Sequence, residues 1–195
     1  DVARVRAVRE AAGGDALIRV DANGGWSVDE AEAALVALAE FGLDYVEQPC
    51  TTVPELTELR RRLTTDRLTT DQKVGGSNPA PRAVRIAADE SVRRAEDPLA
   101  VARAGAADLL VVKAQPLGGI GRALDIVARA GLPVVVSSAL DTSVGIAMGL
   151  HLAAALPEGS LAGACGLGTA ALLEGDVVRD PLLPENGELP VRRPR

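Results

Sequence analysis

The stretch LIRVDANGGW, residues 17–26, decides how the rest of the chain is interpreted. It begins as an apolar strand, closes on the carboxylate of Asp21, adds Asn23 and then turns on Gly24 and Gly25. A single acid at the end of a strand more often caps the following helix than performs chemistry. The stretch therefore becomes informative only if the same arrangement recurs further along the chain.

The sequence around this stretch alternates between helical and strand patterns. Helical spacing in 2–14 and 27–42 flanks strand-like segments at 17–21 and 43–47. The second helical segment opens with Ser27 and Glu30, the spacing of a capping box. The same alternation predicts further strands at 84–89, 108–113, 132–137 and 161–165. Apolar strands joined by helices are typical of a parallel sheet with helical crossovers, so the fold class predicted is α/β.

The number of predicted strands favours a barrel with missing units. A closed (β/α)8 barrel has eight strands and about 250 residues, whereas this chain has 195 residues. Its six predicted strands match a barrel that lacks the first two units. An open, doubly wound sheet is the alternative, although no GxGxxG or P-loop motif follows the first strand. Segment 64–82, which contains LTTD twice and then Gly, Ser, Asn and Pro, is predicted to be a flexible loop insertion.

Composition narrows the classes of partner. The net charge of −6, without a basic cluster that contains aromatic residues, argues against nucleic acid. No apolar run approaches the ~18 residues of a membrane span. Cys50 and Cys165 lack CxxC spacing and indicate the reduced thiols of a cytoplasmic protein. We expect a small-molecule partner, with no nucleic acid and no membrane, and leave a homo-oligomer open.

Charged residues recur where four consecutive predicted strands end: Asp21, Glu47, Asp89 with Glu90 beside it, and Lys113. In a parallel barrel the carboxyl ends of the strands meet at one mouth. Three carboxylates brought together repel one another unless a cation lies between them, and hard oxygen ligands favour Mg²⁺ over Zn²⁺. A neighbouring lysine can act as a base or stabilise an anion. The recurrence favours a metal site over separate helix caps.

The motifs that contain these residues resemble a known family. In chain order, VDANGGW, YVEQP, AADES and VVKAQPLGG are similar to the barrel signatures of the enolase superfamily, in its muconate-lactonizing subgroup. Together with VVVSSALDTSVG and ACGLGT, they are most similar to the actinobacterial o-succinylbenzoate synthases of menaquinone biosynthesis. The resemblance implies an incomplete (β/α) barrel with the last six strands, without the capping domain and first two strands of that family.

The resemblance also implies roles for individual residues. It assigns Asp21, Glu47 and Asp89 as Mg²⁺ ligands, and Asn23 and Glu90 as hydrogen-bonding partners that orient them. Lys113 matches the lysine that faces the enediolate intermediate of the family. The residues implied to bind substrate are Ser137, Ser138, Gly166, Gly168 and Thr169.

The reaction implied is a Mg²⁺-dependent syn dehydration of a cyclohexadiene carboxylate to o-succinylbenzoate. A racemase of N-acylamino acids, or a dipeptide epimerase of the same superfamily, is the alternative, because such enzymes use the same kind of lysine pair. The family's second lysine belongs to a KxK motif on an earlier strand, and Lys73 lies in the 64–82 insertion. We therefore expect a truncated chain with negligible activity by itself, and an inactive remnant is the third interpretation.

Overall fold

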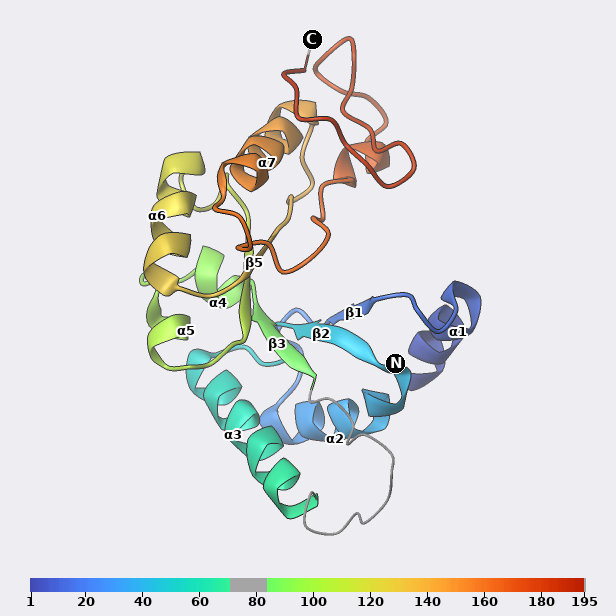
Figure 1. The fold of residues 1–195 in the computed structure, drawn as a ribbon, viewed down its shortest axis with the longest axis vertical. Helices are drawn as coiled ribbons and strands as arrows, with labels where there is room; N and C mark the ends of the chain where they lie inside the picture. The colour runs from blue at the N-terminus through green and yellow to red at the C-terminus, as the bar shows by residue number, and fades with distance from the viewer. Residues whose placement is uncertain (71–83, 195) are drawn as a thin grey trace. The chain divides into compact units, whose positions relative to one another are not determined.

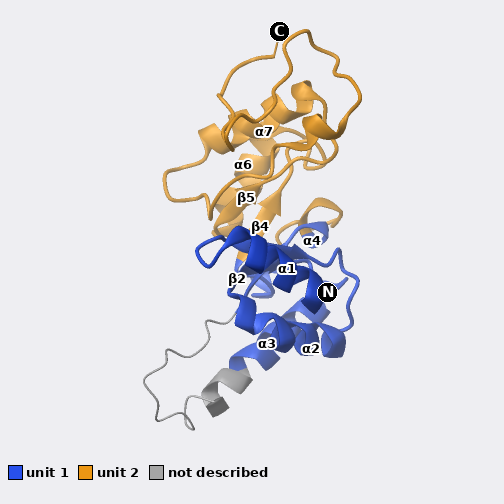
Figure 2. Ribbon diagram, turned by 90° about the vertical axis from the view of Figure 1, so that its right-hand side faces the viewer, with its two compact units in different colours: residues 1–91, 100–108 blue, residues 92–99, 109–195 orange. Residues whose placement is uncertain are grey.

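The computed structural model describes residues 1–70 and 84–194. Contacts between residues divide the chain into two compact units, coloured separately in Figure 2. Unit 1 contains residues 1–91 and 100–108, and unit 2 contains residues 92–99 and 109–195. Each unit is an α/β arrangement of its own and is described separately.

Unit 1 is built on three parallel strands in chain order, β1 to β3. In Figure 1 the helices α2 and α3 lie on the same side of these strands. The elements are α1 (Val2–Ala12), β1 (Ile18–Asp21), α2 (Val28–Leu38), η1 (Ala39–Phe41), β2 (Leu43–Glu47), α3 (Val53–Thr70), β3 (Arg85–Ala88) and α5 (Ala100–Arg103), while α4 (Glu90–Arg93) joins the two units.

The core of unit 1 follows from the alternation of side chains along its strands. Val46 of β2 and Ile86 of β3 lie in register and are almost completely buried. Leu38 of α2 and Phe41 of η1 join Ile18 of β1 in a cluster of buried residues. Neighbouring residues on a strand point to opposite faces. The other face of the sheet is therefore left for the polar side chains at Asp21 and Glu47.

The predicted capping box at the start of α2 is confirmed. The Ser27 side chain accepts from the Glu30 amide, and the Glu30 carboxylate accepts the Ser27 backbone N–H at 2.8 Å. The Ser27 backbone N–H and hydroxyl both donate to the Glu30 carboxylate, and these two hydrogen bonds lower its pKa. The reciprocal bonds satisfy two amide groups that would otherwise have no partner within the helix.

Unit 2 contains two parallel strands covered by helices. Its elements are β4 (Leu109–Val112), α6 (Ile120–Ala130), β5 (Val134–Val136), α7 (Ser143–Ala155) and η2 (Thr169–Leu172). Leu110, Val111 and Val112 pair with the three valines of β5, and all six side chains are buried. Such continuous apolar strands are typical of a parallel sheet with both faces covered.

The sixth strand, predicted at 161–165, does not form as a continuous strand in the structure. Among the described residues this segment forms one isolated parallel bridge, Val134 to Leu161, and a second bridge, Ser137 to Gly166, lies just after it. Gly163 interrupts the segment, and Gly159 and Gly166 flank it. Glycine in a strand loses backbone entropy and contributes no side chain to packing, so the pairing stays local.

The predicted insertion at 64–82 was wrong over its first part. Residues 64–70 continue α3, which extends to Thr70. The Thr64 hydroxyl donates to the carbonyl of Arg60 at 2.9 Å, a bond to the residue four places earlier that keeps threonine compatible with a helix. The remainder of the predicted insertion, 71–82, lies outside the described residues.

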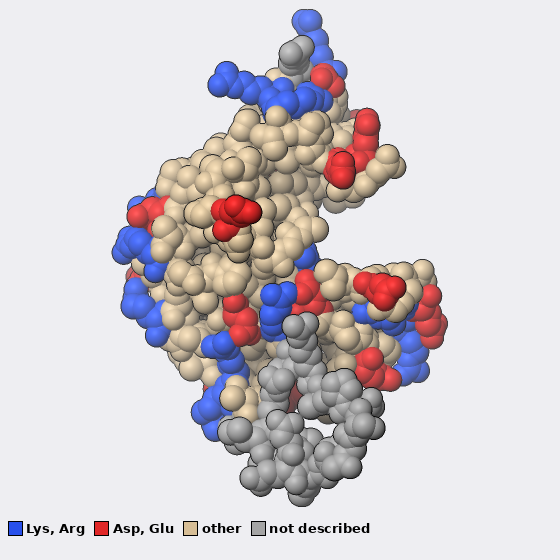
Figure 3. Space-filling view, in the orientation of Figure 1, with Lys and Arg blue, Asp and Glu red and all other residues tan. Residues whose placement is uncertain are grey.

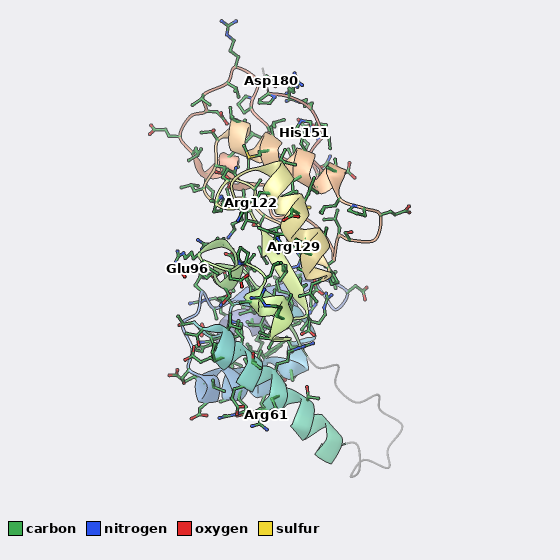
Figure 4. The ribbon with its side chains drawn as sticks, turned by 90° about the vertical axis from the view of Figure 1, so that its left-hand side faces the viewer. Arg61, Glu96, Arg122, Arg129, His151 and Asp180 are labelled. Atoms are coloured by element: carbon green, nitrogen blue, oxygen red, sulfur yellow. The ribbon has the colours of Figure 1, made fainter. Side chains whose placement is uncertain are left out.

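The surface carries charges of both signs. On the face shown in Figure 3, acidic and basic side chains are interspersed. Arg62 of α3 forms ion pairs with Asp29 and Glu32 of α2 and with Glu58 of its own helix. Figure 4 labels Arg61 on α3 and Arg129 on α6, both of which form ion pairs within their own helix. Among the described helices, none is long and apolar enough to cross a membrane.

Candidate active site

Three predicted metal ligands stand at the carboxyl ends of the strands of unit 1. Asp21 is the last residue of β1 and pairs in register with Glu47, the last residue of β2. Glu47 in turn pairs with Ala87 of β3, and Asp89 follows two positions later. In-register residues of parallel strands share a face, and so do residues two apart on one strand. The sheet therefore places Asp21 and Glu47 side by side at the carboxyl ends of β1 and β2, and Asp89 directly follows the end of β3.

The three carboxylates differ in their surroundings. Asp21 is exposed, Glu47 is half-buried, and Asp89 is 2% exposed. One Asp21 oxygen accepts the backbone N–H of Asn23 at 2.8 Å, and Asn23 adopts a positive φ of 49°. This short turn holds the Asp21 carboxylate at the end of its strand, so Asn23 supports Asp21 through its backbone. Glu90 is half-buried and begins α4.

The donor types of the three predicted ligands suit Mg²⁺. All three predicted ligands are carboxylates, the hard oxygen donors that Mg²⁺ binds. In residues 1–70 and 84–194, the side chains do not form a group of three or more His, Cys, Asp or Glu close enough to hold a metal ion. Like charges at one sheet end repel one another, and a bound cation relieves that repulsion. The ligand assignment stays a prediction.

Gln48 lies among these residues, and the sequence analysis did not single it out. Its side chain is completely buried, and its backbone has a positive φ of 36°. The amide nitrogen donates to the Cys50 carbonyl at 2.9 Å and to the Ser91 hydroxyl at 2.7 Å. The amide oxygen accepts the backbone N–H groups of Asp89 at 3.0 Å and Ser91 at 3.2 Å. The motif YVEQP contained the signal, since a polar residue between Glu47 and a proline has to find partners when buried.

Burial raises the pKa of two side chains of unit 1, Tyr45 and Cys50. Burial raises the pKa of Tyr45, and the charge of Arg19, whose guanidinium lies 4.9 Å from the ring centroid, opposes the rise. Burial also raises the pKa of the Cys50 thiol to about 11. Cys50 is therefore a protonated, unreactive thiol near neutral pH, which argues against a nucleophilic role.

Lys113 and the predicted substrate-binding residues belong to unit 2. Lys113 directly follows β4 and is half-buried. Ser137 and Ser138 directly follow β5, and the Ser138 amide donates to the Gly166 carbonyl at 2.9 Å. The structure therefore places Lys113, Ser137 and Ser138 directly after the carboxyl ends of strands, whereas Gly168 and Thr169 lie at the start of η2.

The hydroxyl groups in unit 2 form a connected network. The Ser138 and Thr169 hydroxyls lie 2.8 Å apart, and Thr169 donates to the Ala139 carbonyl at 2.7 Å. A hydroxyl has one proton. Because Thr169 donates its proton to Ala139, it can only accept from Ser138, whose own single proton is shared between Thr169 and the Gly166 carbonyl at 3.0 Å. The Ser137 hydroxyl makes only long contacts with carbonyls, at 3.3 and 3.4 Å, and is half-buried.

Asp141 extends this network, and the sequence analysis did not select it either. One Asp141 oxygen accepts from the Gln115 side chain at 3.1 Å and from the Ala139 amide at 3.0 Å. The Asp141 amide approaches the Thr169 hydroxyl at 3.4 Å. Gly168 precedes η2 as its N-terminal flanking residue. The loops after β4, after β5 and before η2 are therefore linked through side chains that donate and accept in turn.

The sequence profile of the enolase C-terminal domain-like family matches residues 1–194. The chain belongs to this family. Its relatives include the o-succinylbenzoate synthase of Thermobifida fusca (strain YX), 55% identical over 193 residues, which are 99% of this chain and 54% of that protein. The enzyme of the same name from Mycobacterium bovis (strain BCG / Pasteur 1173P2) is 56% identical over 194 residues, 99% of this chain and 52% of that protein. The chain thus spans about half the length of these relatives.

Solved structures of the same superfamily have a similar fold. The muconate lactonizing enzyme of Pseudomonas fluorescens, complexed with muconolactone, has a TM-score of 0.80 and 26% identity, over 100% of this chain and 48% of that one. The dipeptide epimerase of Enterococcus faecalis V583 has a TM-score of 0.74 and 28% identity, over 94% of this chain and 48% of that one. The predicted partial (β/α) barrel of the enolase superfamily is therefore confirmed.

Proposed function

We propose that this chain supplies the catalytic residues of a Mg²⁺-dependent lyase that forms o-succinylbenzoate by syn elimination of water from a cyclohexadiene carboxylate. The observation that carries the proposal is the 55% identity, over 193 residues, to a relative named o-succinylbenzoate synthase. The order of Asp21, Glu47 and Asp89 along one end of unit 1 supports it.

Each residue has a defined task in this reaction. Asp21, Glu47 and Asp89 would hold Mg²⁺. When bound, the ion polarises the substrate carboxylate, which makes the α-proton more acidic. As an ammonium, Lys113 would stabilise the enediolate formed by loss of that proton; as a neutral amine it would instead take the α-proton itself and pass it to the hydroxyl group, which leaves as water. The Ser137 hydroxyl, which has only long contacts with carbonyls, would donate a hydrogen bond to the remote end of the substrate.

A dipeptide epimerase activity is the second candidate. It is favoured by the structural likeness to the Enterococcus faecalis enzyme, which shares 28% identity with this chain. Epimerisation would use the same carboxylates and Lys113 but would return the α-proton to the carbon instead of expelling water. The higher identity to the named synthases favours the lyase. Cys50 and Cys165 do not form a disulfide, which fits a reducing compartment, and we propose that the reaction takes place in the cytoplasm.

Assays of the complete gene product that contains this chain separate the two candidates. The purified protein is supplied with Mg²⁺ and, in parallel, with the cyclohexadiene carboxylate and with a set of L,L-dipeptides. Formation of o-succinylbenzoate that is lost in Lys113→Ala supports the lyase. Exchange of the dipeptide α-proton with deuterated water, without dehydration, would replace it with the epimerase. Failure of both reactions would favour the inactive remnant.

A further inference from the structure

We propose that Gln48 is the positioning residue of the carboxylate site and that its amide sets how tightly unit 1 binds Mg²⁺. This inference rests on the proposed function, since it concerns the same metal ligands. Gln48 is completely buried between Glu47 and Pro49, and its neighbours in space come from three different loops. None of its atoms is a predicted ligand, so its role is to hold other residues.

The hydrogen bonds of the Gln48 side chain are complete. A primary amide has two protons to donate and two lone pairs to accept. The two protons bind the Cys50 carbonyl and the Ser91 hydroxyl, and the two lone pairs accept the amides of Asp89 and Ser91. A reversed amide would direct its own protons at two backbone N–H groups. The partners therefore fix one orientation of the side chain.

The backbone of Gln48 extends the same connection to the first and third strands. Its N–H donates to the Ala87 carbonyl at 2.8 Å, and its carbonyl accepts the Gly24 N–H at 2.7 Å. The loop after β1, the end of β2 and the end of β3 are thus all joined at one residue. Asp21 directly precedes the first of these segments, Glu47 ends β2, and Asp89 directly follows β3.

Gln48 also occupies an unusual backbone conformation. Its φ of 36° lies in the left-handed region, which residues other than glycine seldom adopt. Such conformations persist when the surrounding bonds over-determine them, and they concentrate at functional sites. Here the conformation lets the residue next to Glu47 direct its side chain to Ser91, which lies 43 positions away in the sequence.

The consequence for metal binding is geometric. The position of Asp89 relative to Glu47 depends on the bond between the Asp89 amide and the Gln48 side chain. Mg²⁺ demands near-ideal octahedral geometry, and a site must be held to within about 0.5 Å of that geometry to work. Removing the Gln48 amide would remove the side-chain bond that ties the Asp89 backbone to the end of β2, while the register of β1 and β2 would still pair Asp21 with Glu47.

The test compares Mg²⁺ binding of the complete gene product and its variants by titration calorimetry, without substrate. Gln48→Met keeps the length of the side chain and removes all four hydrogen bonds. Ser91→Ala removes only one partner of Gln48 and is the milder variant, which serves if Gln48→Met does not fold. Ser143→Ala is the control, because Ser143 is also a buried serine but bonds to Asp176 and Leu182.

We expect Gln48→Met to raise the dissociation constant of Mg²⁺ about tenfold or more, the effect typical of residues that orient ligands. Ser91→Ala should shift it in the same direction by less, and Ser143→Ala should leave it unchanged even though it lowers the melting temperature. Equal Mg²⁺ affinity in Ser91→Ala and Ser143→Ala, or unchanged affinity in a folded Gln48→Met, would overturn the inference about Gln48 and leave the proposed function standing. An unsubstituted protein that binds no Mg²⁺ would overturn the proposed function with it.

Discussion

Replacing Gly145 with alanine should break the link between Gln115 and Asp141. Gly145 lies in the first turn of α7, and a Cβ atom there would stand 2.6 Å from the Gln115 amide nitrogen and 2.8 Å from the Asp141 Cβ. Real Cβ atoms do not approach other atoms so closely. The added methyl group must therefore push the two side chains apart and open their 3.1 Å hydrogen bond.

The expected cost follows from opposing contributions. Loss of a hydrogen bond to a carboxylate costs about 1.5–3 kcal/mol, and overpacking adds about 1–3 kcal/mol. Alanine in place of glycine in a helix stabilises the folded state by about 1 kcal/mol. Because the pair is only partly buried, we take the lower ends and expect a net loss of about 1–2 kcal/mol.

Gly121→Ala is the matched control for this measurement. Gly121 lies near the start of α6, and a Cβ there would meet nothing within 4 Å. The same substitution should therefore stabilise by up to about 1 kcal/mol. Both variants of the complete gene product are unfolded in denaturant, and the free energies of unfolding are compared. If Gly145→Ala is as stable as Gly121→Ala, the crowding inferred at Gly145 is refuted.

Three further predictions concern other parts of the chain. Arg9→Met should destabilise unit 1 by about 2 kcal/mol, because Arg9 donates to the partly buried carbonyls of Phe41 and Ala16. Arg4→Met is the control: it removes an exposed ion pair and should change the denaturation midpoint little. The hydrogen bond from Ser143 lowers the pKa of Asp176, so its stabilisation is present above the ordinary carboxyl pKa and lost as pH falls below it. The gap in melting temperature between the unsubstituted protein and Asp176→Asn should therefore close in acid, and an unchanged gap would contradict this. Cys50, buried and with a pKa raised to about 11, should resist alkylation at pH 8 until denaturant is added, as followed by peptide mass spectrometry.

The strands and the order of the charged residues could be predicted from the sequence because both depend on local patterns. The strand predicted at 43–47 is β2, Leu43–Glu47, and the strand predicted at 17–21 is β1 to within one residue. Alternating helices and strands imply parallel pairing, and parallel pairing sets Asp21 beside Glu47.

The roles of Gln48 and Asp141 could not be predicted, because their partners are distant in sequence. Gln48 bonds to Ser91, and Asp141 meets Thr169 across 28 positions. No periodicity encodes such contacts, and a buried amide gives no sign of its partner until the chain is folded. The extent of α3 was missed for a different reason: repeated threonines favour a loop by propensity, yet Thr64 bonds within the helix.

The most direct test of the central claim, that Asp21, Glu47 and Asp89 together hold one divalent ion, is a Mn²⁺ titration followed by electron paramagnetic resonance. The complete gene product is first stripped with chelator, and Mg²⁺ is then added to displace the Mn²⁺. We predict one Mn²⁺ per chain, displaced by Mg²⁺, with binding lost in Glu47→Gln and kept in Glu58→Gln, a surface acid that pairs with Arg61 and Arg62. Equal Mn²⁺ binding by Glu47→Gln and the unsubstituted protein would contradict the account.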